Sequence, residues 1–193
     1  LEQDLVTLEK MESEASRFGA AVGLDSVSTF ECIVDPSRHF FMEMNTRVQV
    51  EHRVSELCYS LQFANPDDID DEFTVDSIIE LMVLLSRHGK RLPKPSRVRR
   101  EGAAAEIRLN ASDDSLKPHT GGVITDWSAP VEEEIRDDQG ICLRNPDTDM
   151  FMHYYLAGAY DSNIALELTT GVDREEALVR AARLLGAMKI SGE

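Results

Sequence analysis

Cysteine and positive charge are scarce in this chain, and long apolar runs are absent. The three cysteines, Cys32, Cys58 and Cys142, lie far apart without a C-x-x-C pair, which argues for reduced thiols and against a structural zinc site. Lysine and arginine number 20 against 36 aspartates and glutamates, and the net charge of −16 argues against nucleic-acid binding. No apolar run approaches the roughly 18 residues of a membrane span, and there is no basic and apolar secretion signal. We therefore expect a soluble, cytoplasmic protein.

A dense polar run follows an apolar strand near the first quarter of the chain. Residues 40–56 read F-F-M-E-M-N-T-R-V-Q-V-E-H-R-V-S-E, and a period of two places Phe41, Glu43 and Asn45 on one face of the predicted strand. A carboxylate and an amide are costly to bury in a core strand unless a metal, an anion or a substrate satisfies them. The run therefore predicts a functional site. The alternative is a solvated edge strand that runs into a charged loop.

The preceding segment predicts a second strand that pairs with the first. Residues 28–34, S-T-F-E-C-I-V, are β-branched and aromatic, as strands prefer. If residues 36–38 form the connecting loop, Glu31 lies directly opposite Glu43, with the two Cβ atoms roughly 5 Å apart. Two facing carboxylates need a cation or a shared proton, and with Asn45 they suit Mg²⁺ or Mn²⁺, a phosphate completing the coordination shell. A register slip of one residue would instead place the two glutamates on opposite faces.

The run E-M-N-T-R-V-Q-V-E-H, residues 43–52, resembles a signature of the biotin carboxylases. These are ATP-grasp proteins, the ATP-dependent subunits or domains of acetyl-CoA, propionyl-CoA and pyruvate carboxylases. Other ATP-grasp enzymes, such as carbamoyl phosphate synthetase, share the glutamate–x–asparagine core but are not expected to continue as Q-V-E-H. The resemblance extends in order through T-F-E at 29–31, E-I-R-L-N-A at 106–111 and Y-D-S at 160–162.

The resemblance implies an α+β fold in three parts. Residues 1–60 would form the C-terminal part of an ATP-grasp domain. Residues 61–100 would form a helical connection with an acidic loop. Residues 101–193 would form the biotin carboxylase C-terminal domain, a mostly antiparallel sheet with packed helices, incomplete at its end.

The resemblance also assigns metal and biotin roles to four residues. Glu31 and Glu43 resemble the carboxylates that hold the Mg²⁺ or Mn²⁺ ions bridging the phosphates of ATP, with Asn45 beside them. Arg108 resembles the arginine that stabilises the biotin enolate when carboxyphosphate releases CO₂.

Bicarbonate recognition is implied for the segment after Asn45. Arg47 resembles the arginine that clamps bicarbonate, helped by the backbone amides of Gln49 and Val50. A guanidinium fork suits this role because it binds a planar anion bidentately. Glu51 resembles the general base that deprotonates bicarbonate before it attacks the γ-phosphate. In an extended segment Glu51 and Arg47, four positions apart, can point the same way.

The implied activity is that of an ATP-dependent ligase. It carboxylates biotin through carboxyphosphate, using ATP and bicarbonate, in the first half-reaction of a biotin-dependent carboxylase. The implied partners are a biotin carboxyl carrier protein or domain and a carboxyltransferase, and family members often form homodimers. Which acyl-CoA or keto acid is finally carboxylated would depend on the carboxyltransferase.

The chain lacks two parts that an ATP-grasp enzyme needs. It has no glycine-rich phosphate loop, and its lysines lie in no nucleotide-binding context. In the family those parts precede the point that matches Leu1. We therefore expect an excised fragment that has no ATPase or carboxylase activity alone.

Three departures from the family pattern favour other interpretations. Arg53 follows the signature histidine where proline or threonine is common, Leu166 replaces a lysine, and the acidic stretch 62–73 has no expected counterpart. These features fit a non-catalytic homologue that serves as an interaction or dimerisation module. A third interpretation, another ATP-grasp carbon–nitrogen ligase, is opposed by Q-V-E-H.

Periodicity and capping residues predict the remaining elements, in a chain long enough for one sizeable core or two small ones. The predicted helices cover residues 3–22, 74–88 and 173–189, with Gly23 ending the first and Ser77 and Asp173 capping the others. The second helix is nearly apolar all round, so we expect it to be buried. The predicted strands cover residues 102–110, 123–127, 131–136 and 141–144, the last two joined by a hairpin turn, while residues 92–100 form a connection. Glu132, Glu133 and Glu134 are expected to form a solvated edge.

Overall fold

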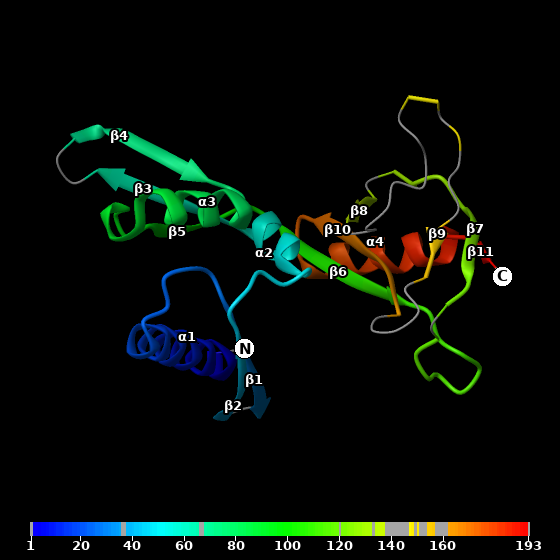
Figure 1. Ribbon diagram of the computed structural model, residues 1–193, viewed down its shortest axis with the longest axis horizontal. Helices are drawn as coiled ribbons and strands as arrows, with labels where there is room; N and C mark the ends of the chain where they lie inside the picture. The colour runs from blue at the N-terminus through cyan, green and yellow to red at the C-terminus, as the bar shows by residue number, and fades with distance from the viewer. Residues whose placement is uncertain are drawn as a thin grey trace. The chain divides into compact units, whose positions relative to one another are not determined.

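The computed structural model of the chain divides into two compact units, the first formed by Leu1–His52 and Tyr59–Arg99, the second by Arg53–Cys58 and Arg100–Glu193 (Figure 1). The residues described are 2–35, 38–65, 68–119, 121–132, 134–137, 147–148, 150, 154–156 and 162–192. Helices and antiparallel sheets occur in both units, which confirms the predicted α+β class. No helix within these ranges is long and apolar enough to cross a membrane.

The first unit opens with a helix that packs against a β-hairpin. Its elements are α1 (Glu2–Val22), β1 (Thr29–Asp35) and β2 (Arg38–Asn45). Phe18 of α1 contacts the ring of Phe41 in β2, with centroids 5.2 Å apart, and a hydrogen bond of 2.7 Å joins His39 to Glu14. Gly23 follows the helix with φ of 70°, a left-handed conformation that glycine adopts without strain. The predicted helix and its end are therefore confirmed.

A second sheet in the same unit replaces the predicted acidic loop and connection. Its strands are β3 (Tyr59–Asn65), β4 (Asp68–Val75) and β5 (Ser96–Arg99), in the order β4-β3-β5. Phe63 and Phe73 are directly paired, their rings stacked with centroids 5.0 Å apart, and Phe63 is fully buried. Phe63 and Val75 are buried at this pairing, and their burial outweighs the low β-propensity of the acidic residues that begin β4.

Helix α3 (Ile78–His88) lies between β4 and β5 in the chain, and the 3₁₀ helix η1 (Gly89–Arg91) follows it directly. The Ser77 hydroxyl accepts hydrogen bonds from the N–H groups of Ile79 and Glu80, at 3.2 and 3.5 Å, which confirms the predicted cap. The helix begins four residues later than predicted because residue 74 belongs to β4. The expected burial is wrong, since no residue of α3 is buried and Val83 is 61% exposed.

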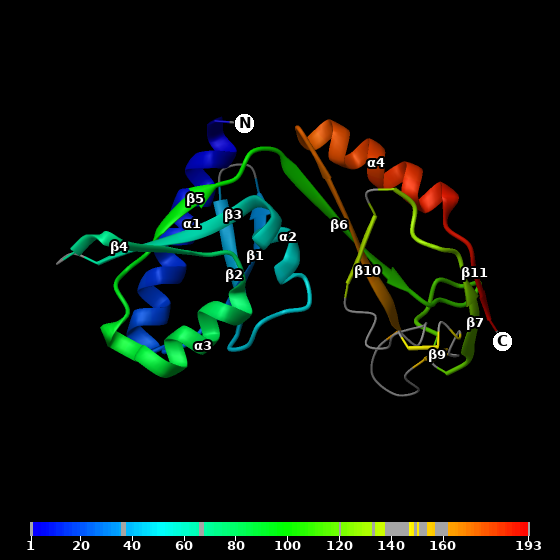
Figure 2. The ribbon, with the colours of Figure 1, turned by 90° about the horizontal axis from the view of Figure 1, so that it is seen from above.

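The second unit contains two three-stranded antiparallel sheets and a long helix. Its elements are α2 (His52–Cys58), β6 (Ala103–Asn110), β7 (Val123–Trp127), β8 (Ile135–Asp137), β9 (Tyr154–Tyr155), β10 (Asn163–Gly171), α4 (Arg174–Ala187) and β11 (Ile190–Gly192). The sheet orders are β6-β10-β8 and β11-β7-β9. Helix α4 packs along β10 and β6 (Figure 2). In β10 the side chains of Ala165, Leu166 and Leu168 are fully buried.

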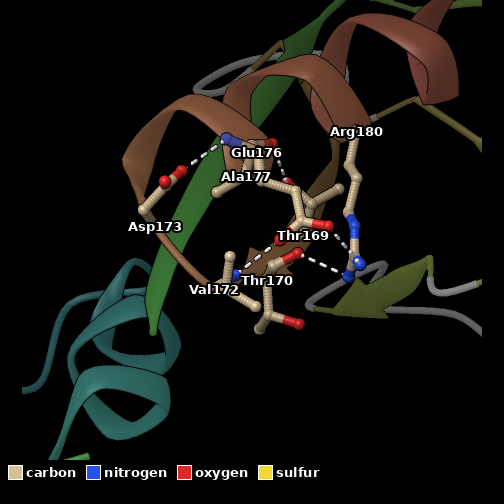
Figure 3. A network of polar contacts seen from close by, with 7 residues as sticks. All are labelled: Thr169, Thr170, Val172, Asp173, Glu176, Ala177 and Arg180. Carbon is tan, nitrogen blue, oxygen red and sulfur yellow. Dashed lines mark hydrogen bonds and ion pairs between the residues drawn. The ribbon is translucent and has the colours of Figure 1, made fainter. Parts of the chain in front are cut away.

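A network of polar contacts joins the end of β10 to the start of α4 (Figure 3). The Asp173 carboxylate accepts from the Glu176 N–H at 2.9 Å, which confirms the predicted cap. The Glu176 carboxylate accepts from the Val172 N–H at 2.6 Å and from Arg180 at 2.8 Å. Arg180 also donates to the Thr170 carbonyl at 2.9 Å. The helix is therefore fixed to the strand that precedes it.

Two acidic side chains, Glu134 just before β8 and Glu167 in β10, are buried close to Arg136. The Glu167 side chain is fully buried and that of Glu134 is 2% exposed, so a solvated edge is wrong for Glu134. Glu134 forms an ion pair with Arg136, whose guanidinium lies 4.7 Å from the Trp127 ring centroid and 3.6 Å from the Glu167 carboxylate. Burial, reinforced by Glu134, raises the pKa of Glu167 to about 8. The Arg136 guanidinium thus interacts with two carboxyl groups.

Several predictions concern residues outside the described ranges. These are the 141–144 strand, the hairpin turn at 138–140, Cys142, Glu133, and the first two residues of the Y-D-S motif.

Candidate functional site

Strands β1 and β2 place Glu31 directly opposite Glu43, as predicted. The predicted loop of three residues is wrong, because Asp35 pairs with Arg38 and only two residues lie between them. A register shift immediately after Glu31 in β1 leaves Met42 of β2 without a partner and restores the predicted pairing. The shift is a β-bulge, a feature that often re-aims side chains beside functional sites.

One amide nitrogen lies between the two carboxylates. Asn45 Nδ2 donates to Glu31 Oε1 at 2.8 Å and to Glu43 Oε1 at 3.1 Å. Gln49 Nε2 donates to the same Glu31 oxygen at 2.5 Å. Carboxylate oxygens only accept hydrogen bonds when ionised, so both amides turn their NH₂ groups toward the acids. These donors offset the repulsion that two facing carboxylates would otherwise suffer.

This set of side chains fits a hard divalent cation. Carboxylate and amide oxygens are the ligands that Mg²⁺ and Mn²⁺ prefer, and Glu31 and Glu43 already converge on a single atom. Within the described ranges no three His, Cys, Asp or Glu side chains form a metal-binding group. A cation held here would therefore need further ligands, for which phosphate oxygens are suitable.

The segment after Asn45 is bent rather than extended. Strand β2 ends at Asn45, residues 46–51 form a bend and a turn, and the His52 N–H donates to the Gln49 carbonyl at 3.2 Å. An extended segment therefore cannot be the reason for Arg47 and Glu51 to point the same way.

Arg47 and the amides beside it are available to a ligand. The Arg47 side chain is exposed, and its guanidinium donates to the Val48 carbonyl at 3.2 Å. Within the described part of the chain, neither the Gln49 nor the Val50 N–H is used in a backbone hydrogen bond. Glu51 is half-buried and interacts with other groups of the chain. Cationic and N–H donors in one short segment suit an anion.

Arg53 and Arg108 belong to the second unit. Arg53 donates to the Glu56 carboxylate at 2.9 Å within α2, and the Glu56 side chain is 5% exposed. Arg108 is exposed on β6 and pairs with Leu166 of β10. Because Leu166 is fully buried, an apolar residue suits that position better than a charged one.

The side chain of Gln49 is the functional candidate that sequence reasoning missed. Only its backbone amide was predicted to take part, yet its side chain contacts Glu31. No residue period indicates this contact, because it forms across the bend that follows Asn45.

Comparisons with known proteins identify relatives of this chain. The family described as carbamoyl-phosphate synthase L chain, ATP binding domain, matches residues 4–65. The biotin carboxylase of Pseudomonas aeruginosa is 30% identical over 171 residues, which are 89% of this chain and 33% of that protein. Biotin carboxylase 1 of Bacillus subtilis is 33% identical over 186 residues, 95% of this chain and 36% of that protein. The chain is related to the biotin carboxylases.

A solved biotin carboxylase also shares the fold. The crystal structure of the biotin carboxylase–beta-gamma-ATP complex from Campylobacter jejuni matches with a TM-score of 0.68 and 27% identity, over 96% of this chain and 36% of that one. This chain spans about a third of the length of the curated biotin carboxylases that it matches.

Proposed function

We propose that this chain supplies the metal site and the bicarbonate site of a biotin carboxylase, which uses ATP and bicarbonate to carboxylate biotin. One observation carries the proposal. Within the E-M-N-T-R-V-Q-V-E-H run, Glu43 faces Glu31 across the hairpin, and Asn45 contacts both carboxylates. The relationship to biotin carboxylases gives this arrangement its chemical interpretation.

Glu31, Glu43 and Asn45 are the residues that would hold Mg²⁺ or Mn²⁺ with the phosphates of ATP. When bound, the ion supplies charge neutralisation between phosphates, which phosphoryl transfer requires. The protein positions the metal ligands, because the hairpin register holds the Glu31 and Glu43 carboxylates on one face.

Arg47 would bind bicarbonate through its guanidinium fork, and the N–H groups of Gln49 and Val50 would add two donors. The Glu51 carboxylate would remove the bicarbonate proton, so that a bicarbonate oxygen can attack the γ-phosphate of ATP, displace ADP and form carboxyphosphate. Arg108 would place positive charge beside biotin while carboxyphosphate releases CO₂. Arg47 and Arg108 would thus supply positive charge to anions, and Glu51 would supply the negative charge that accepts a proton.

The remaining assignments extend this proposal. We assign residues 1–60 to the end of an ATP-grasp domain, 61–100 to a connection and 101–193 to the C-terminal domain. The protein would act in the cytoplasm with a biotin carboxyl carrier and a carboxyltransferase, with a homodimer as one assembly of the full-length form. The chain alone would be inactive, because its sequence holds no glycine-rich phosphate loop.

Phosphate release from ATP tests the proposal in the full-length protein that contains this chain. We expect release to depend on bicarbonate and biotin, and to fall at least about a hundredfold in Glu51→Gln and in Arg108→Ala, as loss of a general base or a charge-stabilising donor typically causes. Glu9→Gln and Arg174→Ala are matched controls, because both side chains are exposed and lie outside the proposed site.

Biotin-independent release, or full activity in both site variants, would contradict the proposal. The chain would then be better described as an interaction module or as part of another ATP-grasp ligase.

A further inference from the structure

Two amides occupy one oxygen of the Glu31 carboxylate. Gln49 Nε2 lies 2.5 Å from Glu31 Oε1, and Asn45 Nδ2 lies 2.8 Å from the same atom. A carboxylate oxygen has two lone pairs, so these two hydrogen bonds use both. The two donors come from different places in the chain, since Asn45 ends β2 and Gln49 lies in the bent segment 46–51.

These hydrogen bonds and a metal ion would compete for the same electrons. Metal coordination by Glu31 Oε1 requires a lone pair that an N–H group now holds. Asn45 presents its NH₂ group to both carboxylates, so its amide must turn before its carbonyl can act as a ligand. Gln49 has the shorter of the two bonds to Glu31, and its segment also carries Arg47.

We propose that Gln49 is a positioning residue that links metal occupancy at Glu31 to the conformation of segment 46–51. The Gln49 bond to Glu31 holds the segment in one arrangement, and metal binding releases it. Metal binding at Glu31 thus changes the positions of the anion-binding groups of the segment, which are Arg47 and the backbone N–H groups of Gln49 and Val50. This inference rests on the metal site proposed above. Thermodynamic linkage requires that the conformation of segment 46–51 in turn changes the affinity for the metal.

The sign of the coupling gives a specific expectation. The hydrogen bond must break for Oε1 to coordinate a metal, so removing it strengthens metal binding. A hydrogen bond to a charged group supports a change of about ten- to a hundredfold in the dissociation constant. Gln49→Leu removes both N–H donors while keeping a side chain of similar size.

Mn²⁺ titration followed by electron paramagnetic resonance, with ADP present to supply phosphate oxygens, tests the inference directly in the full-length protein that contains this chain. We expect Gln49→Leu to bind Mn²⁺ about ten- to a hundredfold more tightly than the unchanged chain, and Glu31→Gln to lose the site. Gln62→Leu is the matched control, because Gln62 Nε2 makes the same kind of bond to Glu72 at 3.0 Å between β3 and β4. The control should bind Mn²⁺ like the unchanged chain.

A second measurement reports on the segment itself. In ¹⁵N nuclear magnetic resonance spectra, Mg²⁺ should shift the Gln49 side-chain amide and the backbone amides of residues 46–51. The backbone shifts should largely disappear in Gln49→Leu, in which the segment is already released.

The outcomes separate the two proposals. If Glu31→Gln abolishes Mn²⁺ binding but Gln49→Leu leaves it unchanged or weaker, the metal site stands and the coupling is wrong. The ion would then bind through the other oxygen with both amide bonds intact, or Gln49 would serve to hold Glu31 in place. If no Mn²⁺ binding responds to Glu31→Gln or Glu43→Gln, the metal role and the coupling fail together.

Discussion

Among the described residues, Glu167 is one whose protonation is strongly tied to folding. Its pKa rises from 4.5 to about 8 because it is buried beside Glu134, while Arg136 opposes the shift. The folded chain therefore keeps a proton that the unfolded chain loses. This contribution to the free energy of unfolding is complete below about pH 4.5 and is lost as the pH rises to about 8, by up to about 1.4 kcal/mol per pH unit.

Glu167→Gln should remove this pH dependence. A neutral amide keeps the size of the protonated acid and cannot ionise, so we expect the variant to be more stable than the parent by roughly 2–5 kcal/mol at pH 8.5. Urea unfolding at pH 5, 7 and 8.5 measures the difference. The exposed Glu132 offers a control, Glu132→Gln, which should follow the parent. Parallel pH profiles for parent and Glu167→Gln would show that Glu167 is not the linked group.

Residue patterns predicted the facing glutamates but could not predict how they are held. Glu31 faces Glu43 as expected, yet a shorter turn and a bulge at Met42 offset each other to give that register. A bulge leaves no distinct signal in a period of two. The burial of Glu134 was likewise hidden, because an acidic run is typical of a solvated surface and its partner Arg136 becomes buried only when β8 pairs with β10.

At the scale of elements, the junction of β10 and α4 depends on a glycine. A Cβ atom at Gly171 would lie 2.5 Å from the backbone nitrogen of Ala177, and backbone cannot move aside without displacing the helix. We therefore expect Gly171→Ala to lower the free energy of unfolding by roughly 2–3 kcal/mol, as overpacking does. Loss of the neighbouring cap in Asp173→Ala should cost only about 1 kcal/mol.

The matched control is Gly186, which lies within helix α4. A Cβ atom at Gly186 would have no neighbour within 4 Å, and alanine is the better helix former by about 0.5–1 kcal/mol. Gly186→Ala should therefore leave the chain as stable or more stable in urea unfolding. Equal effects at both glycines would mean that the strand and helix are not packed as described.

The elements that sequence predicted well are those with a strong local pattern. Helices α1 and α4, with Gly23 and Asp173 at their ends, and strands β1, β6 and β7 follow from periodicity and capping. The β3–β4 hairpin was missed because Phe63 stacks on Phe73 and becomes buried only after the two strands pair across an acid-rich stretch. The burial of α3 was overestimated, because apolar composition alone does not provide a partner surface.

At the scale of the whole molecule, residues with proposed roles occur in each of the two units. The residues assigned to metal and bicarbonate belong to the first unit, and Arg108 belongs to the second. The chain carries a net charge of −16, while ATP and bicarbonate are anions. Long-range electrostatics would therefore oppose their approach, so recognition has to come from local positive groups such as Arg47 and from the metal ion.

Transfer of labelled bicarbonate to biotin tests the central claim most directly. The full-length protein would be incubated with ATP, Mg²⁺, ¹⁴C-bicarbonate and free biotin, and acid-labile label would be measured on biotin. The proposed function predicts label on biotin that requires ATP and is lost in Glu51→Gln but kept in Glu9→Gln. ATP cleavage with no label on biotin would contradict it and would favour a ligase with a different acceptor.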